Sequence, residues 1–230
     1  MPRYDYLLFD ADHTLFDFDQ AEERALRRTL LDCGYPDSAE TVELYHLVNR
    51  FLWHRFDLGE LPREVLVVER FAILDRVLGG QHDPEALNRR YLEHLAEGSD
   101  LLPGAEELCR ALAPHCILAI VTNGLAAAQR GRFARSPLSS LIPWLFISEE
   151  VGYQKPEAEF FRCVLSEMGI SDPSRAVVIG DNLFSDIQGG INAGLDTIWY
   201  HPQGDDPTSG ILPTHTVSSY QALLEYLLTP

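Results

Sequence analysis

Two aspartates directly after a short apolar run are the residues of this chain best suited to chemistry. Asp10 and Asp12 follow residues 6–9, whose apolar side chains predict a buried strand. Side chains alternate along an extended chain, so both carboxylates point the same way if the strand continues past Phe9. At about 4 Å they repel by about 4 kcal/mol at an effective dielectric constant near 20, so a cation or a shared proton must offset the repulsion. The pair suits a nucleophile beside an acid, with a simple aspartate turn as the alternative.

Polar residues also close two other apolar runs. Thr122 and Asn123 stand just before a helical pattern, where a hydroxyl and free backbone N–H groups make either an anion site or a plain helix cap. Asp181 ends a second apolar run, and Asp186 follows five residues later. These two carboxylates are candidate ligands of one metal ion, or caps of the next helix.

Lys155 is the cation that completes this set. It lies in a loop before a helical pattern, either near the strand ends or as an ordinary surface charge. Oxygen ligands for a hard cation, a lysine for phosphate charge and a nucleophile beside an acid together suit magnesium-assisted phosphoryl transfer. Because open α/β sheets bind ligands at the carboxyl ends of their strands, we expect these side chains to converge at one sheet edge.

The elements that must position these residues alternate between strand-like and helical stretches. This alternation predicts an α/β fold with a Rossmann-like parallel sheet covered by helices. Gly189 and Gly190 fit no phosphate-loop pattern and indicate close packing of a helix on a strand. The expected strands are 5–10, 117–122, 145–148, 176–180, 197–200 and a short 214–217, and the expected helices are 105–113, 126–135, 158–168, 184–193 and 221–228.

An all-helical insertion interrupts this rhythm directly behind the first strand. Residues 18–97 contain no convincing strand and have the 3.6-residue periodicity of four helices. We therefore expect a core domain of residues 1–17 and 98–230 and a helical cap domain of residues 18–97. The cap follows the aspartate pair immediately, so it could cover that pair as a lid.

Composition excludes several classes of partner. The chain has 230 residues and a formal net charge of −17, which argues against polymeric nucleic acid or an anionic membrane as partner. An anionic small substrate must then be held by a local cation. The four cysteines lack metal-ligand spacing and no signal peptide or membrane span is evident, which favours the cytoplasm. Residues 201–213 indicate a surface loop, and the oligomeric state stays open.

The order of these motifs resembles the haloacid dehalogenase-like hydrolase superfamily over essentially the whole chain. The resemblance implies that Asp10 is the nucleophile that forms an aspartyl-phosphate and that Asp12 protonates the leaving oxygen and later activates water. It implies that Thr122 and the backbone of Asn123 hold phosphate and that Lys155 neutralises it.

The same resemblance implies a magnesium site. The Asp10 carboxylate, the Asp12 backbone carbonyl and Asp181 would hold Mg²⁺, with Asp186 behind them. The acid at Asp12 matters, because the dehalogenases for which the superfamily is named lack it. The chain therefore resembles the phosphatases of the superfamily.

Within these phosphatases, four stretches resemble the 5′-nucleotidases of pyrimidine and noncanonical nucleoside monophosphates. They are residues 9–12 with 14–16, then 147–152, 185–194 and 196–200. The resemblance implies a nucleoside monophosphate substrate, with phosphoglycolate or a sugar phosphate as the alternative. Trp53 and Phe56 are candidate cap residues facing the substrate, or else members of the helix–helix core.

Two other classes of protein could account for part of this residue set. A phospho-acceptor receiver domain has a similar inventory of Asp, Thr and Lys, but it is about half this length and lacks both a cap and an acid two residues after the acceptor. A phosphatase fold kept as a non-catalytic binding module is disfavoured, because every expected catalytic position is filled.

Overall fold

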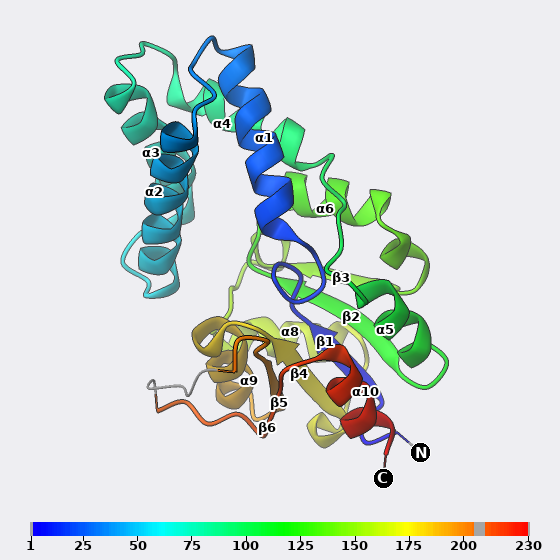
Figure 1. Cartoon of the computed structure of the whole chain (residues 1–230). Coiled ribbons are helices and arrows are strands. Elements are labelled where there is room, and N and C mark those ends of the chain that lie inside the picture. The colour runs from blue at the N-terminus through cyan, green and yellow to red at the C-terminus, as the bar shows by residue number, and fades with distance from the viewer. Residues whose placement is uncertain (1, 205–209, 230) are drawn as a thin grey trace.

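The computed structural model describes residues 2–204 and 210–229. Within them, six parallel strands form one sheet in the order β3-β2-β1-β4-β5-β6 (Figure 1). This order confirms the predicted α/β fold, and the strands lie within one residue of their predicted limits. Part of the predicted loop 201–213, residues 205–209, lies outside the described residues. The strands are β1 (Tyr6–Phe9), β2 (Ile117–Thr122), β3 (Trp144–Ile147), β4 (Ala176–Gly180), β5 (Asp196–Tyr200) and β6 (His215–Val217).

Helices cover both faces of this sheet, because successive strand residues point to opposite faces. Leu7 and Phe9 of β1 pack with α5 (Ala105–Leu112) and α10 (Tyr220–Leu228), whereas Leu8 packs with α8 (Ala158–Glu167). Figure 1 shows α5 and α10 on one side of the sheet and α8 on the other. The remaining core helices are α6 (Ala126–Arg135), α7 (Ser148–Val151) and α9 (Gly189–Asn192), with short 3₁₀ turns η1 (Pro137–Ser140) and η2 (Pro173–Arg175).

The segment after β4 differs from the single helix predicted at 184–193. Residues Leu183–Gln188 form a π-helical segment, η3, that continues into α9. Gly190 then lies so close to the sheet that an added Cβ would stand 2.5 Å from the Thr197 methyl group and 3.2 Å from a Val178 methyl group. The predicted close packing of a helix on a strand is therefore confirmed at this glycine.

Four helices follow β1 and form a separate layer above the strand ends (Figure 1). Their mutual core contains apolar residues of all four helices, among them Leu26, Tyr45, Phe71 and Tyr91. They fall inside the proposed cap, residues 18–97, all of which the structure describes. The four are α1 (Phe18–Asp32), α2 (Ala39–Asp57), α3 (Arg63–Val77) and α4 (Pro84–Leu95).

Two short backbone segments join the cap to the core, and they lie side by side. Phe16 forms an antiparallel bridge with Leu101, and the N–H of Asp17 donates to the carbonyl of Asp100 over 3.0 Å. A second contact joins the far end of the cap to the core, where an Arg63 guanidinium nitrogen donates to Ser148 Oγ over 2.6 Å. The cap is therefore held over the carboxyl ends of the strands.

No helix among the described residues has the length and apolar composition to span a membrane.

Candidate active site

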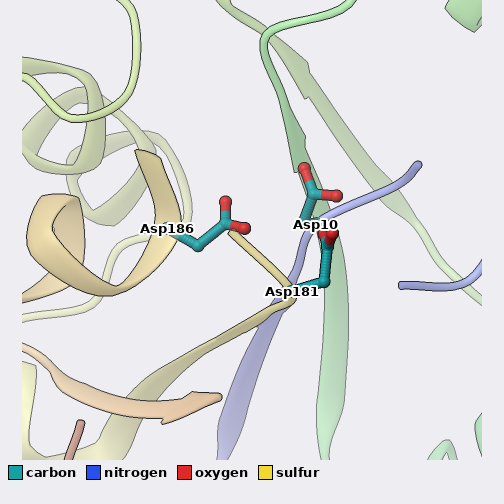
Figure 2. Close-up of side chains that lie close together, drawn as sticks. All are labelled: Asp10, Asp181 and Asp186. Atoms are coloured by element: carbon teal, nitrogen blue, oxygen red, sulfur yellow. The ribbon is translucent and has the colours of Figure 1, made fainter. Parts of the chain in front are cut away.

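Three carboxylates meet at the carboxyl ends of β1 and β4. Asp10 follows β1, Asp181 follows β4, and Asp186 comes from η3. Each offers an oxygen that lies within 4.8 Å of the others, and Figure 2 shows their carboxyl groups turned toward a common space. β1 and β4 are neighbours in the sheet, although Asp10 and Asp181 are 171 positions apart in the sequence. The strand order reverses between these two strands, and doubly wound sheets bind ligands at such a point.

Lys155 is buried between two of these carboxylates. Its Nζ donates to Asp10 Oδ1 over 2.5 Å, to Asp186 Oδ1 over 2.6 Å and to the carbonyl of Val121 over 2.9 Å. Only 1% of the lysine side chain is exposed. The lysine therefore does not behave as a surface charge, and its three donors are all engaged inside the site.

Burial dominates the acid–base properties of the cluster. Desolvation raises the pKa of Asp10 to about 7 against the attraction of Lys155, and Asp186 and Asp12 raise it further. Desolvation also raises the pKa of Asp181 to about 6, with repulsion from Asp10 adding to it. Burial alone would lower the pKa of Lys155, but Asp10 and Asp186 outweigh it and raise that pKa. Lys155 alone therefore does not compensate for the burial and mutual repulsion of these carboxyl groups.

This donor set fits a divalent cation. Three carboxylates against one ammonium leave two formal negative charges in a space lined by carboxylate oxygens, the ligands that Mg²⁺ prefers. Within the part of the chain that the structure describes, Asp10 and Asp181 each keep one carboxylate oxygen without a hydrogen bond. Both oxygens of Asp186 are engaged, by Lys155 and by the Asn182 N–H over 3.1 Å. Asp10 and Asp181 are the better direct ligands, with Asp186 holding Lys155 behind them.

The two polar residues at the end of β2 have different surroundings. Thr122 is almost fully buried, and its Oγ1 accepts from the Gly124 N–H over 3.0 Å. Asn123 clamps the backbone of Lys155, since its Nδ2 donates to the Lys155 carbonyl over 2.8 Å and its Oδ1 accepts from the Lys155 N–H over 3.0 Å. The Asn123 side chain therefore fixes the loop that delivers the lysine.

Asp12 directs its side chain toward α6. Gln129 Nε2 donates to Asp12 Oδ2 over 2.6 Å, and Arg132 forms a close ion pair with Asp12 Oδ1. The backbone turn behind Asp12 is tight: His13 has a left-handed φ of 63°, and its N–H donates to the Phe16 carbonyl over 3.0 Å. Asp12 thus lines the same cavity as Asp10 with a different set of partners.

One cavity of about 570 Å³ joins these strand ends to the cap. Its wall includes Asp10, Asp12, Lys155 and Asp181 from the core and Trp53 from α2. Among the described residues Phe56 is not part of this wall; it is 2% exposed and packs with Leu52 and Leu66. Of the two candidate cap aromatics, only Trp53 faces the cavity, and Phe56 supports it edge-on from behind at 5.3 Å between ring centroids.

Three residues of the site were not identified from the sequence. Thr14 Oγ1 donates to Asp181 Oδ1 over 3.2 Å and accepts from the Asp181 N–H over 3.1 Å, so it holds a proposed metal ligand. Gln129 and Arg132 hold Asp12. Gln129 and Arg132 lie on an amphipathic helix, where polar residues ordinarily face water. Only their three-residue spacing, which places both side chains on one helix face, indicated a shared role.

The fold and the site together define a capped α/β enzyme with an acidic centre, suited to a divalent cation, at the switch point of a doubly wound sheet. The chain belongs to the haloacid dehalogenase-like hydrolase family, whose model matches residues 4–194. The resemblance seen in the sequence motifs is therefore confirmed, and the chain is a hydrolase of this family.

Three similar proteins refine this assignment. Pyrimidine 5′-nucleotidase PynA of Streptococcus pneumoniae (strain ATCC BAA-255 / R6) is 39% identical over 97% of this chain and 95% of its own length. Pyrimidine 5′-nucleotidase YjjG of Escherichia coli (strain K12) is 38% identical over 98% of each chain. The magnesium-bound crystal structure of the putative HAD-hydrolase YfnB from Bacillus subtilis superposes with a TM-score of 0.92 at 35% identity, covering 98% of this chain and 99% of that one.

Proposed function

We propose that this protein is a magnesium-dependent phosphatase that hydrolyses small phosphomonoesters through an aspartyl-phosphate on Asp10. The observation that carries the proposal is that Asp10 and Asp12 line one cavity in different environments. Asp10 is fixed by Lys155 and keeps one oxygen available for attack. Asp12 is fixed by Gln129 and Arg132 and stands apart as the acid–base group. Asp10 as nucleophile and Asp12 as a separate proton donor are the two groups that hydrolysis through an aspartyl-phosphate uses.

The reaction then runs in two displacements on the residues of this chain. The free Asp10 oxygen attacks phosphorus, the bond from phosphorus to the leaving oxygen breaks, and Asp12 gives that oxygen a proton. Water next attacks the same phosphorus while Asp12 takes its proton, and the Asp10–phosphorus bond breaks to release inorganic phosphate. Lys155, the Thr122 hydroxyl and the Asn123 backbone N–H would balance the phosphate charge.

Magnesium would be held by Asp181, the Asp12 backbone carbonyl and the Asp10 oxygen that also accepts from Lys155, which leaves the other Asp10 oxygen for attack. When bound, it would supply positive charge for the phosphate oxygens. Thr14 would keep Asp181 oriented for this role. Asp186 would act through Lys155, which it holds over 2.6 Å.

The substrate we propose is a 5′-nucleoside monophosphate, with pyrimidine nucleotides preferred. PynA and YjjG, which match nearly the whole chain, are both named pyrimidine 5′-nucleotidases. Trp53 lines the cavity on the cap side, where a base could stack on it. A stack of this kind is worth roughly 1–3 kcal/mol, which is about 5- to 150-fold in specificity. Phosphoglycolate or a sugar phosphate remains the alternative substrate class.

A phosphate-release screen with Mg²⁺ tests this proposal. The panel is UMP, dUMP, TMP, CMP, AMP, phosphoglycolate and hexose phosphates, and the measured quantity is kcat/KM. We expect pyrimidine nucleotides to exceed phosphoglycolate. If UMP, dUMP and TMP all fall below phosphoglycolate, the nucleotidase assignment is wrong while the phosphatase assignment survives. Failure to release phosphate from any of them, with a long-lived phosphoprotein instead, would support the phospho-acceptor class.

Further proposals concern organisation, location and partners. We place the cap at residues 18–97 and the core at residues 1–17 and 98–230. The four cysteines are free thiols, which is consistent with a cytoplasmic location. With a net charge of −17, we propose a small phosphorylated metabolite as partner rather than polymeric nucleic acid or a membrane surface.

A further inference from the structure

A buried polar network lies in the cap, on the wall of the same cavity. Arg70 of α3 is 2% exposed, Asn49 of α2 is 3% exposed and Glu22 of α1 is 4% exposed. All three line the cavity that contains Asp10. The network thus joins three cap helices on the cap side of the cavity.

Each member of this network has a defined orientation. Arg70 donates through one terminal nitrogen to Asn49 Oδ1 over 3.1 Å and through the other to Asn88 Oδ1 over 2.7 Å. Asn49 in turn donates through Nδ2 to Glu22 Oε1 over 2.6 Å. Glu22 Oε2 accepts from His46 Nδ1 over 2.8 Å, so both carboxylate oxygens of Glu22 are engaged.

Arg70 has hydrogen-bonding capacity that the protein does not use. Its Nε has no hydrogen-bond partner among the described residues, and its two partners are neutral amide oxygens rather than a carboxylate. The guanidinium lies 4.7 Å from the centre of the Tyr91 ring, which stabilises its charge without consuming a donor. Buried arginines are ordinarily paired with an acid, because an uncompensated buried charge is costly. An arginine held in place by two amides at a cavity wall therefore points to a ligand that accepts hydrogen bonds.

The charges around Arg70 select a neutral acceptor rather than an anion. The Glu22 carboxylate is joined to Arg70 through Asn49, and it would repel a second anionic group of the substrate that approached Arg70. The carbonyl oxygen of a nucleobase is a neutral acceptor of the required kind. Uracil, thymine and cytosine all carry such an oxygen on the ring, whereas adenine carries none.

We propose that Arg70, oriented by Asn49 and Asn88, binds a carbonyl oxygen of the pyrimidine base and so determines which nucleotides this enzyme prefers. This inference rests on the proposed nucleotidase function. Arg70 acts on substrate choice and not on the phosphoryl group, which lies at Asp10 and Lys155. Asp10 and Arg70 line the same cavity, whose volume of about 570 Å³ lies in the range of small-molecule sites.

The experiment compares UMP with ribose 5-phosphate, which keeps the sugar and phosphate but lacks the base. In Arg70→Met, we expect kcat/KM for UMP to fall at least about tenfold while that for ribose 5-phosphate changes less than about twofold. Arg76→Met is the matched control, because Arg76 is an exposed arginine on the same helix α3. The control variant should leave kcat/KM for both substrates unchanged.

Each outcome separates this inference from the function on which it rests. If wild type does not prefer UMP over ribose 5-phosphate, the nucleotidase function itself fails. If wild type prefers UMP and Arg70→Met keeps that preference, or loses activity on phosphoglycolate as strongly as on UMP, the role of Arg70 is wrong. If circular dichroism shows that Arg70→Met does not fold, Arg70→Lys is used instead, because it retains the charge. In that variant, a ratio of kcat/KM for UMP to kcat/KM for ribose 5-phosphate equal to that of wild type also overturns the proposal.

Discussion

Gln129 Nε2 lies 2.6 Å from Asp12 Oδ2 and 3.3 Å from Thr122 Oγ1, so one side chain of α6 holds both the candidate acid–base group and the candidate phosphate-binding hydroxyl. Gln129 is only 4% exposed, and an added Cβ on Gly124 would stand 2.2 Å from Gln129 Nε2, so the amide fills its space tightly. Arg132, one turn later on α6, pairs with the other oxygen of Asp12 and donates through Nε to the Gly98 carbonyl over 2.9 Å. The position of Asp12 is thereby linked to the backbone that joins the cap to the core.

Gln129→Leu should lower kcat by about tenfold or more while changing KM little. The substitution leaves Asp12 with a single partner on α6, so its carboxyl group is less often at the leaving oxygen. The loss should stay below the ~10²–10⁴-fold expected for Asp12→Asn, which removes the acid–base group itself. Steady-state phosphate release measures both parameters. The exposed Gln221 of α10 offers the control Gln221→Leu, and an equal fall in both variants would contradict a positioning role for Gln129.

Asp10→Asn should abolish phosphate release, because the amide cannot accept the phosphoryl group. The variant should still fold, since Asn can accept the hydrogen bond that Lys155 now gives to Asp10 Oδ1 over 2.5 Å. Phosphate release over an extended incubation, with circular dichroism as the folding check, measures the effect. Wild-type turnover by Asp10→Asn would exclude Asp10 as the nucleophile.

Removal of divalent cations should abolish the phosphatase activity of the wild-type enzyme, and added Mg²⁺ should restore that activity. The reason is the excess of negative charge among Asp10, Asp181 and Asp186, which Lys155 alone does not offset. Activity is measured in EDTA and then after titration with MgCl₂. Asp181→Asn should raise the Mg²⁺ concentration needed for half-maximal activity. Full turnover in EDTA would mean that no metal takes part.

Asp57→Asn should stabilise the protein at neutral pH and lose that advantage in acid. Desolvation raises the pKa of Asp57 from 3.8 to about 6, against the attraction of Lys155 and His54. A carboxyl group with a raised pKa in the fold stabilises the protein below its unfolded pKa, and this stability is lost as the pH rises through about 6. We expect Asp57→Asn to gain about 1–2 kcal/mol above pH 7, with the gain shrinking toward pH 4.5. Thermal melting of both proteins across this pH range measures the difference in stability. A stability gain that does not depend on pH would show that the titration of Asp57 is not the cause.

The sequence determined the sheet and the cap because both depend on local apolar patterns. Each strand is a short apolar run between turn residues, and its limits were predicted to within one residue. The cap helices have the 3.6-residue periodicity that predicts helices regardless of their partners. The segment after β4 differs, because it forms the π-helical turn η3, in which Asp186 reaches Lys155, before α9 begins.

The motif residues were also evident from the sequence, since parallel strands bring their carboxyl ends to one sheet edge. Asp10, Thr122 and Asp181 needed only this rule to be placed together, whereas Lys155 lies in the loop between α7 and α8, whose backbone Asn123 holds. The sequence could not decide between Trp53 and Phe56, because both lie on α2 and only the packing of Phe56 against Leu66 of α3 removes it from the cavity wall.

Tertiary structure alone decided the partners of the buried charges. Arg132 lies 120 residues from Asp12, and Arg70 lies 21 residues from Asn49 on a different helix. In the sequence each arginine belongs to an amphipathic helix whose polar residues ordinarily face water. Only the docking of the cap on the core, and of the cap helices on one another, buries them and determines which side chains they bind. A local pattern carries the periodicity of a helix, but it does not encode which distant surface will cover its polar face.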